Sequence, residues 1–340
     1  MSEILAPCGA MESLTAAVSA GADAVYLGEE YFSARKNADN FTAEQLCDAV
    51  RFCHYSGVKV YVTLNTLVFD REIPLLAKAI ENCAKADVDA FIVQDMGVAR
   101  LSRQIVPELP LHASTQMTVN SPEGAIMAKE LGFTRVVLGR ELSFAQIKAI
   151  TESCDIETEL FVHGALCVCI SGQCYMSSVL GGRSGNRGLC AQPCRLDFTS
   201  GDRHNVLSLK DLSLTEKLPE LAKAGITSFK IEGRMKRPEY VAGAVNACRV
   251  ALDGGTPDLI SLKNVFSRSG FTSGYFDDDF KNMQGVRTKD DVTSATSKVL
   301  SAMKQYYHKP FRRFPADITV NVKSGQPVCY KLSAFGVSSS

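Results

Sequence analysis

Short β-branched runs alternate with amphipathic helical stretches along most of this chain, from Ile4 to Arg234. This alternation is typical of parallel strands that are joined by crossover helices. Eight runs have strand character: Ile4–Pro7, Ala24–Gly28, Lys59–Thr63, Ala90–Gln94, Leu111–Ser114, Arg135–Leu138, Glu159–Val162 and Ser228–Ile231. Eight such strands predict an α/β fold of the (β/α)8 type, a TIM-like barrel, rather than an open sheet.

The spacing of these strands also predicts how the 340 residues divide. We expect residues 1–255 to form the barrel, with a cysteine-rich insertion over 163–205 between strands seven and eight. A helix is expected at 238–252. Residues 256–310 are predicted to be an irregular, partly helical extension, with a polar helix near 290–307. Segments 316–322 and 327–332 resemble a hairpin that opens a small β domain over 311–340. Because a lone hairpin is marginal in water, we expect this domain to be truncated.

Charge is balanced over the whole chain but not locally. The sequence has 37 basic and 37 acidic residues, which argues against a global nucleic-acid footprint. Residues 183–237 nevertheless carry eleven Lys and Arg against six Asp and Glu, a local excess of five positive charges. Such a patch could meet an anionic substrate or could be only a solvated face. No apolar run reaches the length of a membrane span, so no membrane association is expected.

Four cysteines crowd into one segment rich in glycine and arginine. Cys167, Cys174, Cys190 and Cys194 follow the pattern C-x6-C-x15-C-x3-C, and Cys169 is an extra thiol nearby. No C-x2-C clip of the kind common in structural zinc sites occurs, whereas wide, uneven spacings suit an iron–sulfur cluster. Because the N-terminus reads as a strand rather than a signal peptide, we expect a reducing cytoplasmic location, which disfavours disulfides. Alternatively, these cysteines are small buried hydrophobes, as is expected for helical Cys47, Cys53, Cys83 and Cys248.

Polar residues recur where the predicted strands end, the rim at which barrel enzymes place their chemistry. The candidate catalytic residues are Gln116, Arg140, Lys230, Glu232 and Arg234. The three cations could clamp a carboxylate or a phosphate, and arginine can do so in bidentate fashion. The alternative is that these charges merely neutralise one another in a rim network. His163 could pair with Cys167 as a nucleophilic dyad, but packing or support of neighbouring ligands is the stronger interpretation.

Several separate blocks carry a family resemblance. Residues 159–167 (ELFVHGALC) and 171–177 (SGQCYMS) resemble the signature of peptidase family U32, the collagenase-like proteins. Further blocks are ILAPCG at 4–9, GADAVYLG at 21–28, HASTQ at 112–116, RGLCAQPCR at 187–195, LSLKDL at 207–212 and FKIEGR at 229–234. The resemblance covers about residues 3–280. It is nearest to the ribosomal RNA cytidine hydroxylase branch and next to the transfer RNA uridine hydroxylases.

This resemblance implies a 4Fe-4S cluster on Cys167, Cys174, Cys190 and Cys194, and a prephenate-like carboxylate as the oxygen source. It therefore implies hydroxylation of a base in ribosomal or transfer RNA, with RNA and a small carboxylate as partners. One alternative is a U32-type peptidase. Another is a cluster-bearing partner subunit of a hydroxylase complex.

Overall fold

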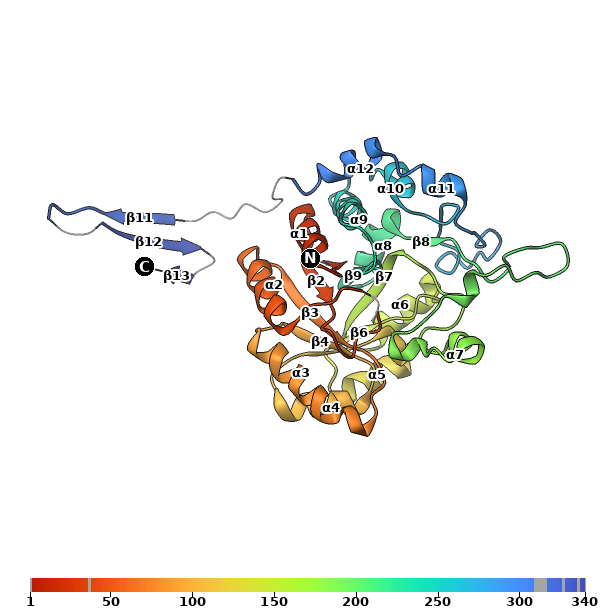
Figure 1. The fold of residues 1–340 in the computed structure, drawn as a ribbon, viewed down its shortest axis with the longest axis horizontal. Helices are drawn as coiled ribbons and strands as arrows, with labels where there is room; N and C mark the ends of the chain where they lie inside the picture. The colour runs from red at the N-terminus through yellow and green to blue at the C-terminus, as the bar shows by residue number, and fades with distance from the viewer. Residues whose placement is uncertain (1, 36–37, 309–316, 326–327, 335–336, 340) are drawn as a thin grey trace.

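Eight parallel strands close into a barrel in the computed structural model, which describes residues 2–35, 38–308, 317–325, 328–334 and 337–339 (Figure 1). The strands are β1 (Glu3–Pro7), β2 (Ala24–Leu27), β3 (Lys59–Leu64), β4 (Ala90–Val93), β5 (Leu111–Ala113), β6 (Arg135–Val137), β7 (Glu157–Gly164) and β9 (Ser228–Ile231). Each pairs in parallel with its neighbour, and β9 pairs with both β7 and β1, which closes the sheet. The predicted barrel is therefore confirmed, and every predicted strand overlaps one of these eight.

Helices cover the outside of this barrel. They are α1 (Met11–Ala20), α2 (Ala43–Tyr55), α3 (Ile73–Lys85), α4 (Met96–Ile105), α5 (Pro122–Glu130), α6 (Phe144–Ser153), α8 (Leu218–Lys223) and α9 (Pro238–Leu252). Capping residues determine where helices begin. At the start of α2, Thr42 and Gln45 form a capping box that satisfies free backbone N–H groups. Apolar helix faces pack against the outward-facing strand residues to form the main core. The predicted helix at 238–252 is α9.

The barrel interior contains a small apolar layer and a network of buried charges. Leu5, Tyr26, Tyr61 and Ile92 belong to the apolar layer. Beside it, Glu159 is fully buried and accepts hydrogen bonds from Lys230 Nζ at 2.6 Å and from Arg135 at 3.2 Å. The guanidinium of Arg135 also binds Glu3 and Glu157, each at 2.7 Å. A buried charge is costly without a partner, and each of these charges has one.

Two short strands that the sequence did not predict extend the sheet beside β7, one before β9 in the chain and one after it. β8 (Asp211–Ser213) pairs antiparallel with the end of β7, through His163 and Gly164, and β10 (Phe271–Thr272) pairs with β8. Strands of two or three residues are too short to show a periodic pattern, which explains the omission. The insertion contains a short helix, α7 (Met176–Gly181). Gly164 has φ +110°, and a Cβ there would lie 2.6 Å from the carbonyl oxygen of Glu232, so this fork requires glycine.

The C-terminal third differs in part from expectation. α10 (Leu259–Val265) follows the barrel, and α11 (Lys289–Thr293) and α12 (Ser297–Lys304) replace the single polar helix predicted near 290–307. Thr296 caps α12 and so marks a break that the polar composition alone conceals. A separate antiparallel sheet contains β11 (Asp317–Asn321), β12 (Cys329–Ala334) and β13 (Val337–Ser339). The starts of the two predicted hairpin strands, residues 316 and 327, lie outside the described residues. We retain the domain division at residues 255 and 310 as a proposal.

Candidate functional site

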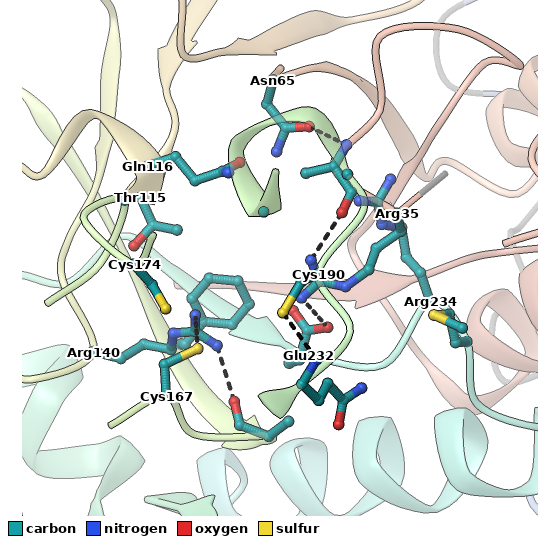
Figure 2. Close-up of a pocket in the computed structure, with 18 of the residues that line it drawn as sticks. Arg35, Asn65, Thr115, Gln116, Arg140, Cys167, Cys174, Cys190, Glu232 and Arg234 are labelled. Atoms are coloured by element: carbon teal, nitrogen blue, oxygen red, sulfur yellow. Dashed lines mark hydrogen bonds and ion pairs between the residues drawn. The ribbon is translucent and has the colours of Figure 1, made fainter. Parts of the chain in front are cut away.

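A cavity of about 580 Å³ opens at the carboxyl ends of the barrel strands, and part of its wall is the cysteine-rich insertion (Figure 2). Tyr26 of β2, Thr63 of β3 and Phe161 of β7 line its barrel side. The cavity is also lined by every residue that the sequence put forward for the site: Gln116, Arg140, Cys167, Cys174, Cys190, Cys194, Lys230, Glu232 and Arg234. The fold thus brings these residues together from segments far apart in the sequence.

The four cysteines differ from most others in the chain because they reach the cavity. Cys167 and Cys190 are exposed, while Cys174 and Cys194 are partly buried. Burial and the neighbouring thiols of Cys167, Cys190 and Cys174 raise the pKa of Cys194, although Arg195 opposes the shift. Figure 2 shows the sulfur atoms of Cys167, Cys174 and Cys190 around the same space. In contrast, Cys53, Cys83 and Cys248 are completely buried on helices, as predicted for packing residues, whereas Cys47 on α2 is only partly buried.

The placement of these four thiols indicates which kind of metal group they could bind. Within the described part of the chain, no three His, Cys, Asp or Glu side chains are arranged to hold a single metal ion. The four thiols nevertheless surround one cavity and come from a loop that folds back on itself. Four cysteine ligands on such a loop are the donor set of an iron–sulfur cluster, which is larger than one ion. The residues present fit a cluster better than a structural zinc.

Arg187 anchors the insertion to the loop after β3. Its guanidinium binds the two carboxylate oxygens of Glu72 at 2.6 and 2.9 Å and donates to the carbonyl oxygen of Leu67 at 2.6 Å. It also lies 4.4 Å from the ring centroid of Phe69. The hydrogen bonds from Arg187 lower the pKa of Glu72 to about 2. Bidentate pairing of this kind fixes orientation as well as position, so it holds the segment that carries Cys190.

A second anchor connects the insertion to the loops after β5 and β6. Gln116 Nε2 donates to Asn186 Oδ1 at 3.3 Å, and Asn186 donates to the carbonyl oxygen of Gly172 at 3.0 Å. Glu141 accepts hydrogen bonds from the backbone N–H and the hydroxyl of Ser171, at 3.0 and 2.8 Å. Gln116 therefore contacts the insertion directly, in addition to lining the cavity.

Arg140 lies between the barrel and the thiols. Its guanidinium donates to the carbonyl oxygen of Ala165 at 2.9 Å and to Cys167 Sγ at 3.3 Å, and it packs 5.0 Å from the ring centroid of Phe161. Its Nε is buried without a hydrogen-bond partner. No carboxylate in the described residues forms an ion pair with Arg140. The residue therefore brings a positive charge to Cys167 and to the cavity, and the nearby carboxylate on which it acts is Glu232.

Lys230 and Glu232 are already paired with other charges. Lys230 contacts Glu159 in the barrel interior, and burial lowers its pKa despite that partner. Glu232 binds Arg35 at 3.0 Å. Although burial opposes its ionisation, the positive charges of Arg35, Arg140 and Arg234 hold the pKa of Glu232 at about 2. For these two residues, the rim-network interpretation describes the contacts that the structure shows.

Arg234 has a different environment. Its guanidinium donates to the hydroxyls of Ser33 and Thr63, at 2.6 and 2.9 Å, and burial lowers its pKa to about 10. Of the carboxylates in the described chain, none forms an ion pair with it. Arg140 and Arg234 thus bring two guanidinium groups to one cavity, and the ionised Glu232 is the carboxylate near both. Neither forms a direct ion pair in the described residues, so both can still bind an anionic ligand.

His163 is a packing residue in this structure. It is 1% exposed, its ring lies 5.0 Å from that of Phe271, and Nδ1 contacts the hydroxyl of Ser213 at 3.4 Å. Its Nε2 is buried without a partner, so His163 does not pair with Cys167 as a nucleophilic dyad would. Burial lowers its pKa to about 4.

Sequence reasoning missed several cavity residues. Arg35 lies in the loop after β2 and pairs with Glu232, while Asn186 positions Gln116. Lys236 and Arg268 also line the cavity. A usable signal existed for Arg35, because the residues that follow a barrel strand lie at the active-site face. Arg268 gave no such signal, because it reaches the cavity through β8 and β10, which were not predicted.

Comparisons with known proteins agree with this picture. The model of peptidase family U32 matches residues 9–284. The chain is 43% identical over 284 residues to the 23S rRNA 5-hydroxycytidine C2501 synthase of Escherichia coli, covering 81% of this chain and 42% of that protein. It is 38% identical over 270 residues to tRNA hydroxylation protein P1 of Bacillus subtilis, covering 75% and 64%. A collagenase of Porphyromonas gingivalis is 36% identical over 306 residues, covering 81% and 73%.

The chain thus spans less than two thirds of the length of the first two relatives. No helix in the described residues combines the length and apolar character needed to cross a membrane.

Proposed function

We propose that this chain, which belongs to peptidase family U32, forms the catalytic barrel of an iron–sulfur-dependent enzyme that hydroxylates a base in ribosomal or transfer RNA. One observation carries the proposal: four cysteine thiols and the unpaired guanidinium groups of Arg140 and Arg234 line a single cavity. Thiols supply the ligands of a cluster, and the cations supply a site for an anionic reactant. The RNA-hydroxylating relatives supply the class of substrate.

Cys167, Cys174, Cys190 and Cys194 would hold the cluster, which supplies one-electron chemistry when it is bound. Arg140 donates a hydrogen bond to Cys167 Sγ and so fixes the position of that ligand against the barrel. Arg187 and Asn186 hold the ligand loop against the barrel through Glu72 and Gln116. These residues order the ligand loop independently of the cluster.

The cavity floor would bind the small carboxylate cosubstrate, which we expect to be prephenate-like. Arg234 and Arg140 can donate their remaining guanidinium N–H groups to a carboxylate, because neither forms an ion pair with a carboxylate in the described residues. Glu232 would act by keeping Arg35 and Arg234 oriented, and Lys230 by contributing positive charge beneath them. Both residues are therefore proposed as positioning residues.

Metal analysis tests the cluster directly. Protein purified without oxygen should contain about four iron and four sulfide per chain, the complement of a 4Fe-4S cluster. A Cys190→Ala variant should lose most of both, whereas Cys154→Ala, at the end of α6 and away from the cavity, should keep them. Zinc in place of iron, or equal loss in both variants, would exclude the cluster.

Mass spectrometry of ribosomal and transfer RNA from a deletion strain tests the reaction. A base in that RNA should lack one oxygen atom, and the wild-type gene should restore it while an Arg234→Met variant should not. Unaltered RNA in the deletion strain would reject the proposed reaction. A protein that carries the cluster but needs a second protein for turnover would instead be a partner subunit.

Peptidase activity has weaker support in the geometry. The collagenase relative belongs to the same family, but the Cys167 and His163 pair is not assembled. Peptide hydrolysis by the purified protein that disappears in Cys167→Ala would restore that alternative.

A further inference from the structure

Three cations surround one aromatic ring at the edge of the cavity. Lys236 lies on the turn after β9, where its backbone N–H donates to the carbonyl oxygen of Gly233 at 2.8 Å. Its Nζ is 2.9 Å from the ring centroid of Phe266. The guanidinium carbons of Arg287 and Arg268 lie 4.4 and 5.4 Å from the same centroid. Attraction to the ring holds these side chains together in spite of their like charges.

These three charges are only partly balanced by carboxylates, and Glu232 acts on Lys236 from the cavity side. Asp211 is the acidic residue at this place, and it is paired with Arg268. Within the described chain, neither Lys236 nor Arg287 forms an ion pair. Burial, with repulsion from Arg268 and Arg287, lowers the pKa of Lys236 to about 7, and Asp211 offsets this only in part. Crowding of like charges in a partly buried place disfavours the charged lysine, and a bound anion would remove that penalty.

Two of these three cations, Lys236 and Arg287, are more exposed than the cations of the cavity floor, whereas Arg268 is only 8% exposed and supports them beside Phe266 through its pairing with Asp211. Arg234 is 6% exposed and sits among the hydroxyls of β3 and the loop after β2. Lys236 lines the cavity, and Met235, which precedes it in the chain, is 56% exposed. Arg287 is exposed. The floor can accept only a group that enters the cavity. The rim can accept an anion that stays outside, which is the position of a backbone phosphate when its base enters the cavity.

We infer that Lys236, together with Arg268 and Arg287 around Phe266, binds a phosphate group of the RNA backbone next to the base that enters the cavity. The inference rests on the RNA substrate proposed above. It assigns the cavity rim to the backbone and leaves the floor to the small carboxylate. A phosphate contact of this kind gives affinity and register but no base selectivity.

Salt dependence of RNA binding tests this inference. The dissociation constant of a single-stranded 12-nucleotide RNA is measured from low to high salt for wild type, Lys236→Gln and Arg287→Gln. Each lost phosphate contact should reduce the slope of log affinity against log salt by about 0.7. Lys129→Gln, which removes an equal charge from the exposed face of α5, should leave the slope unchanged. Because Arg287 is exposed, its variant carries the test even if Lys236→Gln does not fold.

A second measurement reports on Lys236 itself. Its pKa is followed by NMR of the ¹³C-methylated lysine, and the same RNA should raise it, whereas inorganic phosphate at equal concentration should raise it less. Slopes equal to that of Lys129→Gln would overturn the inference, and so would phosphate binding without RNA binding. Base hydroxylation is measured in a separate experiment. If hydroxylation is intact but the salt slopes of the Lys236 and Arg287 variants equal that of wild type, only the rim site is rejected. If those slopes change but no base is hydroxylated, only the proposed reaction is rejected.

Discussion

Charged side chains form ion pairs in the barrel interior, whereas several cations in the cavity above it form none. Inside the barrel, Glu159 joins Lys230 to Arg135, and Arg135 is further bound by Glu3 and Glu157. In the cavity, Arg140, Arg234 and Lys236 have no carboxylate partner in the described chain. Compensated charges contribute to the fold, because removal of either partner leaves the other buried and unpaired. Cations without a direct ion pair can bind an anion from outside, so we expect their removal to affect the proposed function more than the fold. This difference predicts where substitutions affect stability and where they affect function.

The largest effect should follow from breaking the interior network. Glu159→Gln leaves both Lys230 and Arg135 short of a buried counter-charge, so the free energy of unfolding should fall by about 3 to 5 kcal/mol. Chemical denaturation measures this loss. Glu157→Gln is the matched control, because Glu157 also binds Arg135 but its side chain is 53% exposed, and it should cost less than about 1 kcal/mol. Equal losses in the two variants would contradict the comparison.

A charge can also be added to the interior by lowering the pH. His163 is buried and its pKa is about 4 in the folded protein, against about 6.5 in the unfolded chain. The unfolded state therefore binds the proton more readily between these values, and stability must fall as the pH decreases from 6.5 to 4. The contribution of His163 should be about 3 kcal/mol across that window.

Other groups titrate in the same range, so the measured quantity is the difference between wild type and His163→Phe. The wild-type free energy of unfolding should rise more steeply with pH than that of the variant. Parallel curves would show that His163 is not the source.

The smallest change in stability should come from the cavity. Arg234→Met removes no carboxylate partner, and Ser33 and Thr63 remain within hydrogen-bond distance of one another at 3.2 Å. The free energy of unfolding should change by less than about 1 kcal/mol, while base hydroxylation is lost. Lys230→Met, only four residues away, should destabilise the protein markedly because it leaves Glu159 with Arg135 alone. If both variants lose equal stability, the division between the two regions fails.

The sequence predicts the barrel well because each strand and helix has a strong local signal. Runs such as Ala24–Leu27 and Ala90–Val93 are apolar on both faces, as strands covered by helices must be. The short strands β8 and β10 were not predicted because they depend on pairing, of β8 with β7 and of β10 with β8, rather than on their own composition. The break between α11 and α12 is likewise a local capping event at Thr296.

The candidate site is predicted in membership but not in pairing. Position after a strand correctly puts Gln116, Arg140 and Arg234 on the cavity. It does not reveal that Glu232 pairs with Arg35, which lies 197 residues away in the chain. Nor does it reveal that Lys230 pairs with Glu159, which lies 71 residues away. Side-chain pairing over such separations is set by the closed barrel. These ion pairs can therefore be identified only once it is known which strands are neighbours in the barrel.

The order of strands at the closure has a consequence for synthesis. β7 and β9 meet in the barrel, but the whole insertion lies between them in the chain. All four cavity cysteines therefore leave the ribosome before Ser228 begins the strand that completes the sheet. During that interval the thiols are carried by an open, unfinished barrel, to which an assembly factor has wide access.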